Sequence, residues 1–198
     1  MSRLILASGS PRRRQLLQLA GFDLDDIVPP DIPEIRDPTE TPMQYVRRLA
    51  KEKAHAVQGE SAWILAADTI VHLDNDIFEK PVDDADSLRM MQTLSGTWHK
   101  VTTAWCLRWS GDVPCPSRKR IVRGHRTSRV LLRDLTDIEI TRYIATKDGH
   151  GKAGGYAIQG EGAGLIDRVV GSTTNVVGLP LDMLVPHMLS LGIERSRL

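Results

Sequence analysis

The sequence predicts an α/β fold in which a sheet is flanked by helices, built as one domain over residues 1–198. Segments typical of strands and of helices alternate along the chain, the order that characterises this class. The run at residues 63–67 is continuously apolar, which is typical of a central strand buried on both faces. Hydrophobic residues make up 41% of the 198 residues, and this proportion supports one sizeable core.

The chain begins with an apolar strand expected at residues 4–7 and a helix expected at 12–20. Pro11 suits the first helical position, because its φ is already helical and its missing N–H is not needed there. Ser10 can cap the free amides of the first helical turn. The proline- and acid-rich residues 27–42 are expected to form a loop.

The middle of the chain alternates apolar runs with turn residues. Thr41 and Pro42 open a helix, since a capping residue followed by proline is a typical helix start. Acids in the first turn of the 83–94 segment favour a helix there, because they suit the helix dipole. In chain order, the expected elements are a helix from Thr41 to about residue 57, the strand at 63–67, a short strand at 70–73, the helix at 83–94, and antiparallel strands at 101–109 and 120–132.

The C-terminal third holds shorter expected elements. Thr136 and Glu139 form a capping box, which predicts a helix from there to about residue 146. Pro186 lies inside an apolar helix expected at 181–191 and should bend it. The remaining expected elements are a flexible loop at 149–155 and two short strands at 156–158 and 164–170.

The composition excludes several classes of function. The 26 Lys and Arg residues nearly balance the 25 Asp and Glu residues, so nothing global indicates nucleic acid or a membrane surface as a partner. No run is apolar and long enough to span a membrane, and no N-terminal stretch indicates secretion. Cys106 and Cys115 can pair across a hairpin, but a reduced cytoplasmic protein is the simpler interpretation.

The turn after the first strand carries the clearest functional signal. Ser8 and Gly9 lead into a helix whose first turn carries the arginines Arg12, Arg13 and Arg14. The helix dipole favours anions at this end, so three cations make sense there when an anion binds among them. Free backbone amides and bidentate guanidinium groups both favour a phosphate. The alternative is an exposed basic turn without a ligand.

Two charged residues occupy positions that the hydrophobic pattern assigns to the interior. Lys53 falls on the apolar stripe of its helix, so its side chain either snorkels to water or points into an active cleft. Asp68 follows the apolar run 63–67 and is expected at the carboxyl end of that strand, where ligands of open α/β sheets bind. Asp68 is a candidate metal ligand or general base, the alternative being a turn residue.

Four further polar residues are weaker candidates. Glu34 can join Asp68 around a hard divalent cation, although most loop glutamates face water. Lys80 is followed by a proline that can hold it in place, and Gln159 lies in a glycine-rich turn suited to the edge of a nucleobase. His99 is a ligand candidate, with a structural role as the alternative.

The basic stretch at residues 118–133 can in principle bind RNA. No aromatic residues interleave with its arginines to stack bases, so a charged strand edge that resists aggregation is the favoured interpretation. Nucleic acid is therefore not an expected partner. The other candidates, cationic side chains together with two acids that can hold a metal, form a site suited to a polyphosphate.

Seven short motifs follow one another along nearly the whole chain. They occupy residues 6–13 (LASGSPRR), 49–54 (LAKEKA), 67–71 (ADTIV), 79–81 (EKP), 94–99 (LSGTWH), 152–160 (KAGGYAIQG) and 176–181 (VVGLPL). In this order they resemble the Maf family of nucleoside triphosphate pyrophosphatases. Each motif is weak alone, but seven in sequence make the resemblance specific.

The resemblance implies a mixed, elongated and twisted sheet flanked by helices, similar to the inosine triphosphatase fold, with a cleft between two lobes. It also implies hydrolysis of a nucleoside triphosphate to the monophosphate and pyrophosphate, with Mg²⁺ or Mn²⁺ as cofactor and usually by a homodimer. By this resemblance Asp68 would be the proton acceptor, and Glu34 and Asp68 would hold the metal. The phosphate-binding residues that it implies are Ser8, Arg12, Arg13, Lys53 and Lys80.

Arg12, Thr69 and Gln159 resemble the specificity residues of the family branch that acts on dTTP and UTP. The other branch prefers 7-methyl-GTP and typically carries Trp, Gln or Glu, and a Ser-Glu-Gly loop at these three places. A second alternative is a nucleotide-binding regulator of cell division and septum formation. A pure binding protein need not keep Asp68, so catalysis is the favoured interpretation.

Overall fold

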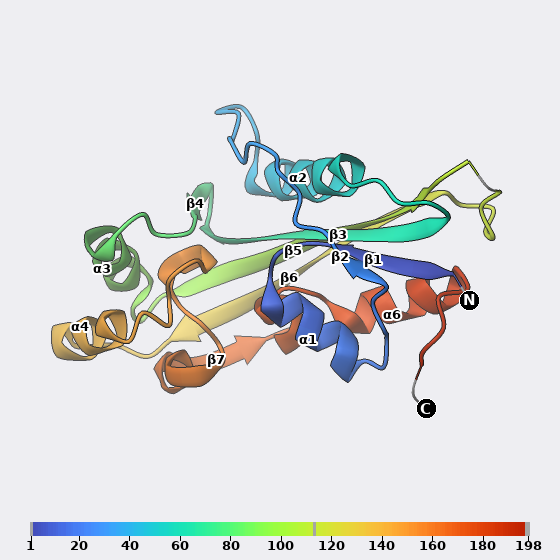
Figure 1. The fold of residues 1–198 in the computed structure, drawn as a ribbon. Helices are drawn as coiled ribbons and strands as arrows, with labels where there is room; N and C mark the ends of the chain where they lie inside the picture. Colours follow the sequence, from blue (N-terminus) through green and yellow to red (C-terminus); the bar gives the residue numbers. More distant parts are fainter. Residues whose placement is uncertain (1, 113, 197–198) are drawn as a thin grey trace.

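A twisted sheet of seven strands runs along the molecule (Figure 1). The computed structural model describes residues 2–112 and 114–196. The strands lie in the order β2-β1-β3-β5-β6-β7, with β4 paired to β3. β1 pairs in parallel with β2 and β3, whereas the other described pairs are antiparallel. The strand bounds are β1 Arg3–Ala7, β2 Asp26–Ile27, β3 Ala62–Leu73, β4 Asp76–Phe78, β5 Trp98–Ser110, β6 Ile121–Leu132 and β7 Ile166–Val170.

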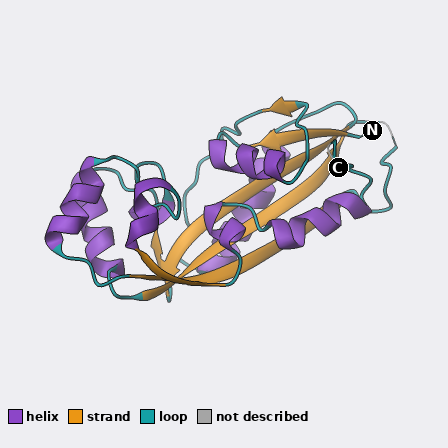
Figure 2. Cartoon of the chain, turned by 90° about the horizontal axis from the view of Figure 1, so that it is seen from below, coloured by secondary structure: helices purple, strands orange, loops and turns teal. Residues whose placement is uncertain are grey.

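Helices cover both faces of the sheet and one of its ends (Figures 1 and 2). α2 packs on one face over β3 and β5, while α1, α5 and α6 cover the other face and α3 lies beside α4 at one end. The helix bounds are α1 Pro11–Leu19, α2 Pro42–Ala56, α3 Asp84–Leu94, α4 Asp137–Ala145, α5 Thr173–Val177 and α6 Leu181–Ser190. The expected mixed and elongated α/β fold is confirmed. None of these helices combines the length and apolar content that crossing a membrane requires.

Hydrophobic residues form separate clusters beneath these helices. The largest includes Trp63 and Trp105 and lies between the sheet and the helices α1 and α6. A second includes Met91 and Tyr143 and lies beneath α3 and α4. Two smaller clusters lie under α2. The strands β3, β5 and β6 are the longest of the sheet, with 12, 13 and 12 residues. At the usual rise per residue they span roughly 40 Å.

One edge of β3 is open in the middle of the sheet. β1 pairs with β3 only as far as Ala66, and β4 pairs with the same edge only from Val71 onward. Among the described residues no strand covers this edge at 67–70, whereas β5 pairs continuously with the opposite edge. Side chains from both faces of the sheet can therefore reach the same space beside Asp68.

The prediction that Asp68 lies at the end of a strand is wrong. The expected strands at 63–67 and 70–73 are a single element, β3, and Asp68 lies in its middle. Thr69 and the branched residues after it favour strand structure, and β5 pairs with them without interruption. Asp68 is tolerated inside the strand because its side chain has a buried cationic partner, described below.

Short elements account for most of the other differences. β2, β4 and α5 have two, three and five residues, which is too short for hydrophobic periodicity to reveal them. Residues 156–158 form no strand, and 3-10 helices at Ala153–Gly155 and Gly160–Leu165 flank them. The backbone of Tyr156 is extended, but among the described residues no strand pairs with the 156–158 segment.

The expected helix starts differ in how they are capped. Thr41 and Thr136 both form complete capping boxes, with Gln44 and Glu139 respectively. Ser10 occupies the N-cap position of α1, but its side chain makes no capping hydrogen bond, so that expectation is wrong. The first amides of α1 consequently remain without a side-chain acceptor at this position.

The basic stretch at residues 118–133 lies largely on β6. β7 pairs with β6 only from Arg129 onward, so the earlier part of β6 is a sheet edge with exposed residues such as Arg123 and His125. The expected charged strand edge is therefore present. Cys106, on β5, and Cys115 are both free thiols.

His99 makes the stability of the fold sensitive to acid. The side chain is buried, with Nδ1 facing the carbonyl of Thr97 at 3.0 Å and Nε2 facing the hydroxyl of Tyr156 at 2.7 Å. Nδ1 therefore carries the proton and Nε2 accepts, which confirms the structural alternative for His99. Burial lowers the pKa of His99 from 6.5 to about 4, so between these values the unfolded chain binds a proton that the folded chain does not.

We expect the melting temperature of the wild-type protein to fall as the pH drops from 6.5 to about 4. Protonation in this range favours the unfolded state, so stability rises with pH across it. The variant His99→Gln should be less stable at neutral pH but should show a shallower dependence over the same range. Thermal unfolding of both proteins at intervals of pH tests this, and parallel curves would contradict it.

Candidate active site

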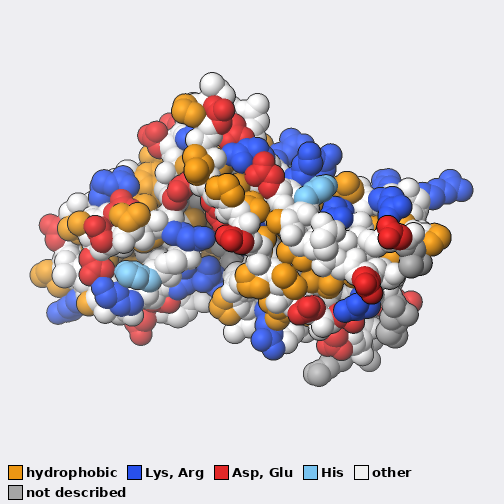
Figure 3. Space-filling view, turned by 45° about the horizontal axis from the view of Figure 1, so that its top comes forward, with side chains coloured by type: hydrophobic (Ala, Val, Ile, Leu, Met, Phe, Trp, Pro, Cys, Tyr) orange, Lys and Arg blue, Asp and Glu red, His pale blue; other side chains and the backbone are white. Residues whose placement is uncertain are grey.

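A cavity of about 780 Å³ opens beside the uncovered edge of β3. Its walls come from the β1–α1 turn, α2, β3 and the segments 148–160 and 176–177. Figure 3 shows a hollow in the surface with acidic and basic side chains around it. Small-molecule sites in proteins usually measure roughly 300–1,000 Å³, so this cavity can enclose a nucleotide-sized ligand.

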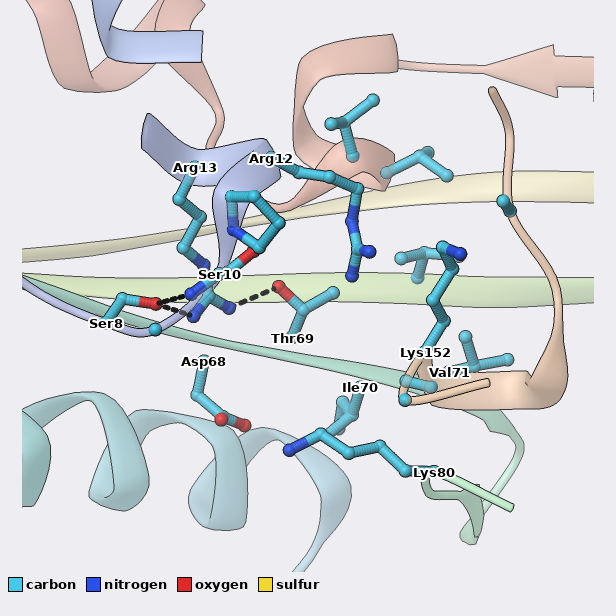
Figure 4. Close-up of a pocket in the computed structure, with 18 of the residues that line it drawn as sticks. Ser8, Ser10, Arg12, Arg13, Asp68, Thr69, Ile70, Val71, Lys80 and Lys152 are labelled. Atoms are coloured by element: carbon cyan, nitrogen blue, oxygen red, sulfur yellow. Dashed lines mark hydrogen bonds between the residues drawn. The ribbon is translucent and has the colours of Figure 1, made fainter. Parts of the chain in front are cut away.

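Arg13 is held in the wall of the cavity by three hydrogen bonds. Nε donates to the carbonyl of Gly178 at 3.0 Å. Nη1 donates to the Ser8 hydroxyl at 3.0 Å and Nη2 to the Thr69 hydroxyl at 3.1 Å (Figure 4). Burial lowers the pKa of Arg13, and the charge of Asp68 opposes that shift. A guanidinium carries five N–H donors, so donors remain for an anion in the cavity.

Gly178 provides the carbonyl that receives Arg13 Nε. This residue ends α5 with a φ of 134°, a conformation that side chains other than hydrogen rarely allow. The chain reverses at Gly178, and its carbonyl then points toward Arg13, which is 165 residues earlier in the sequence. The guanidinium is thus fixed by three elements: the β1–α1 turn, β3 and α5.

Lys53 links two carboxylates on the other side of the cavity. Its ammonium lies 2.6 Å from Asp68 Oδ1 and 2.9 Å from Glu34 Oε1. The side chains of Lys53 and Asp68 are each only 9% exposed, so the ion pair is largely shielded from solvent. Snorkelling to water is therefore ruled out for Lys53, which points into the cleft as the helical pattern allows.

Glu34 and Lys80 complete this charged group from two loops. Burial raises the pKa of Glu34, but the hydrogen bond and charge of Lys53 outweigh burial, and the pKa ends below its ordinary value. Lys80 lies 3.9 Å from Glu34 Oε2, and its side chain is 62% exposed. Figure 4 shows the Lys80 ammonium directed toward Asp68 across the cavity. Glu34 is thus ionised and surrounded by cations at neutral pH.

The sequence patterns did not single out Tyr45 and Glu79, which also line the cavity. The Tyr45 hydroxyl lies 3.0 Å from Glu79 Oε1 and 2.9 Å from the Glu34 carbonyl oxygen. Burial, followed by the adjacent Glu79, raises the pKa of Tyr45, which keeps the phenol protonated and able to donate. Tyr45 is one of the buried residues of α2, so its position in the sequence indicates only a ring in the core. Nothing in the sequence indicates a contact for its hydroxyl.

The cavity is also lined by Arg12, on α1, and by Gln159, which follows β6 in the chain. Burial lowers the pKa of Arg12, and the charge of Asp148 opposes the shift. Asp148 accepts hydrogen bonds from Lys152 Nζ at 3.1 Å and from the Gly162 amide at 3.2 Å. These bonds tie the loop that carries Gln159 to the cavity wall, a role for Asp148 and Lys152 that the sequence did not indicate.

Nine of the candidate site residues of the sequence line this cavity. They are Ser8, Arg12, Arg13, Glu34, Lys53, Asp68, Thr69, Lys80 and Gln159. Arg14, by contrast, is exposed on α1. His99 does not line the cavity but is buried against Tyr156, which does. The charged groups of the cavity therefore come from six different segments of the chain.

Glu34 and Asp68 are the carboxylates of the cavity that lie close enough together to share a divalent cation. No group of three or more His, Cys, Asp and Glu side chains with metal-binding geometry occurs within residues 2–112 and 114–196. Glu34 and Asp68 nevertheless direct one oxygen each at the same ammonium, that of Lys53. Mg²⁺ is usually held by one or two carboxylates together with substrate phosphates. The two carboxylates fit that arrangement, in which the substrate supplies the other ligands.

The fold and the cavity define a mixed α/β protein with a cation-rich, carboxylate-containing site for an anionic ligand. The model of the Maf-like protein family matches residues 3–190, and the chain belongs to the Maf family. A protein of Geobacter metallireducens described as dTTP/UTP pyrophosphatase is 43% identical over 193 residues, covering 96% of this chain and 97% of that protein. A protein of Anaeromyxobacter dehalogenans with the same description is 45% identical over 179 residues, covering 90% and 89%.

Solved structures show a more distant likeness. A HAM1 protein from Coxiella burnetii matches with a TM-score of 0.43 and 16% sequence identity, over 68% of this chain and 75% of that chain. The family assignment is independent of this structure, because it rests on the match along residues 3–190 and on the relatives above.

Proposed function

We propose that the protein hydrolyses nucleoside triphosphates, with dTTP and UTP favoured, to the monophosphate and pyrophosphate. The observation that carries this proposal is the arrangement of Lys53 between Asp68 and Glu34, opposite the fixed guanidinium of Arg13, in one cavity. Cations that can neutralise a triphosphate thus surround an acid that can take a proton. The names of the relatives in the same family support the choice of reaction and of nucleotide.

In this proposal a water molecule attacks the α-phosphorus of the nucleotide. A bond forms between the water oxygen and phosphorus, the bond from phosphorus to the bridging oxygen breaks, and pyrophosphate leaves. Asp68 accepts the proton from the attacking water, which is general base catalysis. Asp68 Oδ1 lies 2.6 Å from Lys53 Nζ, and this contact holds the carboxylate in place among the cations of the cavity.

The cationic side chains hold the triphosphate and stabilise its growing charge. Arg13 binds through its remaining donors, and Arg12, Lys53 and Lys80 extend the positive surface around the phosphates, while the Ser8 hydroxyl holds Arg13 in place. Glu34 and Asp68 would hold a divalent cation, Mg²⁺ or Mn²⁺, as the family generally implies. Such an ion, when bound, neutralises charge on the phosphate oxygens and polarises the α-phosphate.

The choice of base falls in this proposal to Arg12, Thr69 and Gln159. Gln159 offers both a donor and an acceptor, the pairing that the O4 and N3–H edge of uracil or thymine requires. Gln159 lines the same cavity as the arginines, on the loop that Asp148 ties down. Resemblance to the family further supports a homodimer in the cytoplasm, which light scattering on the purified protein and localisation of a tagged copy test.

Pyrophosphate release from a panel of nucleotides tests the function. We expect dTTP and UTP to be cleaved fastest in the presence of Mg²⁺ or Mn²⁺, with CTP, ATP and 7-methyl-GTP slower, and chelation of the metal to stop the reaction. A preference for 7-methyl-GTP would assign the protein to the other branch of the family. No cleavage of any nucleotide, with binding retained, would instead support a nucleotide-binding regulator.

A further inference from the structure

A chain of buried hydroxyl groups leads from the cavity into the sheet. The Arg13 guanidinium donates to the Thr69 hydroxyl at 3.1 Å, and the Thr69 and Thr103 hydroxyls lie 2.9 Å apart. Thr103 donates in turn to the backbone carbonyl of Asn175 at 2.9 Å. Thr103 and Asn175 are fully buried, on β5 and α5, and neither lines the cavity. The four groups form a continuous relay that begins at a proposed phosphate-binding residue.

The direction of every hydrogen bond in the relay is determined. A carbonyl oxygen only accepts, so the single proton of Thr103 is committed to Asn175. Thr103 must then accept from Thr69, whose own proton is thereby directed into the sheet. The Thr69 hydroxyl consequently presents a lone pair to Arg13, which as a guanidinium only donates. Each group therefore sets the orientation of the next, ending at the side chain of Arg13.

Asn175 anchors the inner end of the relay. Its side-chain oxygen accepts from the Thr103 amide at 3.2 Å, and its Nδ2 donates to the Val101 carbonyl at 2.9 Å and to Ser128 Oγ at 3.0 Å. The side chain is 0% exposed, so these bonds face no competition from water. β5, β6 and α5 are thus joined at one residue, which fixes the carbonyl that ends the relay.

We propose that Thr103 is a positioning residue for the pyrophosphatase reaction, acting through Thr69 on Arg13. This proposal rests on the proposed function, because it assumes that Arg13 binds the triphosphate. Loss of the Thr103 hydroxyl frees the Thr69 proton to turn toward Arg13, where one donor would meet another. Arg13 then loses one of the three hydrogen bonds that hold it, and its affinity for phosphate falls.

The adjacent residue Thr102 offers a matched control. It is the same residue type on the same strand and is equally buried, at 0% exposure. Its hydroxyl bonds to Thr127 at 2.8 Å and to His72 at 3.1 Å, on the opposite face of the sheet from the relay. Thr102→Val and Thr103→Val therefore remove the same atoms at neighbouring buried positions, but only the second breaks the relay.

The experiment measures KM and kcat for dTTP in Thr103→Val, Thr103→Ser and Thr102→Val, with the melting temperature of each protein. We expect Thr103→Val to raise KM about tenfold, the size of one lost hydrogen bond to a charged group, and Thr103→Ser to restore it. Thr102→Val should be destabilised to a similar degree with KM unchanged. A merely structural defect lowers the folded fraction and hence the apparent kcat, so the change in KM distinguishes positioning from stability.

A double variant gives a second readout. In a Thr69→Val background the relay is already broken, so adding Thr103→Val should raise KM by less than about twofold. The effects of the two substitutions on KM are then not additive, as expected for coupled residues. Full additivity, an unchanged KM in Thr103→Val, or an equal rise in Thr102→Val would each overturn the proposal.

Binding of inorganic pyrophosphate, measured by calorimetry, separates this proposal from the function itself. If the wild-type protein cleaves no nucleotide, the proposed function fails. The relay is then judged by pyrophosphate affinity, which should weaken in Thr103→Val and stay at the wild-type value in Thr103→Ser and Thr102→Val. Equal affinity in all four proteins would overturn the relay.

Discussion

Replacing Asp68 with asparagine is expected to lower the rate of pyrophosphate release by at least about 10²-fold, the usual contribution of a general base. Asparagine keeps the shape of the side chain but accepts no proton at neutral pH. It also removes one of the two carboxylates proposed to hold the metal. Lys53 keeps its contact with Glu34 at 2.9 Å, so its buried ammonium still has a partner and the fold should persist.

The rate of pyrophosphate release from dTTP by Asp68→Asn is compared with that of Asp76→Asn. Asp76 is an exposed residue of β4 outside the cavity, so its substitution changes charge without touching the site. Circular dichroism and thermal unfolding show whether each variant is folded. Near-normal turnover by folded Asp68→Asn would refute the proposed role of this residue.

Replacing Arg13 with lysine is expected to lower kcat/KM for dTTP by about 10²–10³-fold, a loss typical of removing a preorganised donor to transition-state charge. Lysine retains the positive charge but has a compact ammonium in place of a planar fork. It cannot reach Gly178, Ser8 and Thr69 together, as Arg13 does at 3.0 to 3.1 Å. The charge that remains would therefore be poorly placed for phosphate.

Arg14→Lys is the matched control for this prediction. Arg14 is the next residue of α1 and is exposed, whereas Arg13 is built into the cavity wall. Both substitutions leave the net charge and the helix unchanged. We expect Arg14→Lys to retain wild-type kcat/KM, and equal activity of the two variants would show that only charge matters at position 13.

Local patterns were sufficient to predict most helices and to single out charged residues that line one cavity. The helical spacing of α2 placed Lys53 on the buried stripe, and the structure pairs it with Asp68. The turn after β1 predicted an anion site from its arginines, although the expected cap by Ser10 is wrong. The prediction for Lys53 is confirmed because it depends on residues close together in the sequence, whereas the anion site stays a prediction.

No local sequence pattern predicted the open edge of β3 at residues 67–70. The lengths of β1 and β4 determine that residues 67–70 lack a partner on one edge, and both are set by pairing across the sheet. Asp68 resembles a strand end in the sequence, yet β5 carries the strand past it. Pairing partners from distant segments therefore decided where the cavity opens.

The sequence by itself determined the α/β class, the helices with strong caps and nine of the residues that line the cavity, because propensity, capping and motif are short-range properties. Only the tertiary structure decided which of these residues touch. The contacts of Arg13 with Gly178, of Thr69 with Thr103 and of Tyr45 with Glu79 join segments 34 to 165 residues apart. Their geometry depends on how the sheet and the helices pack, since each contact is closed by long-range burial and strand pairing.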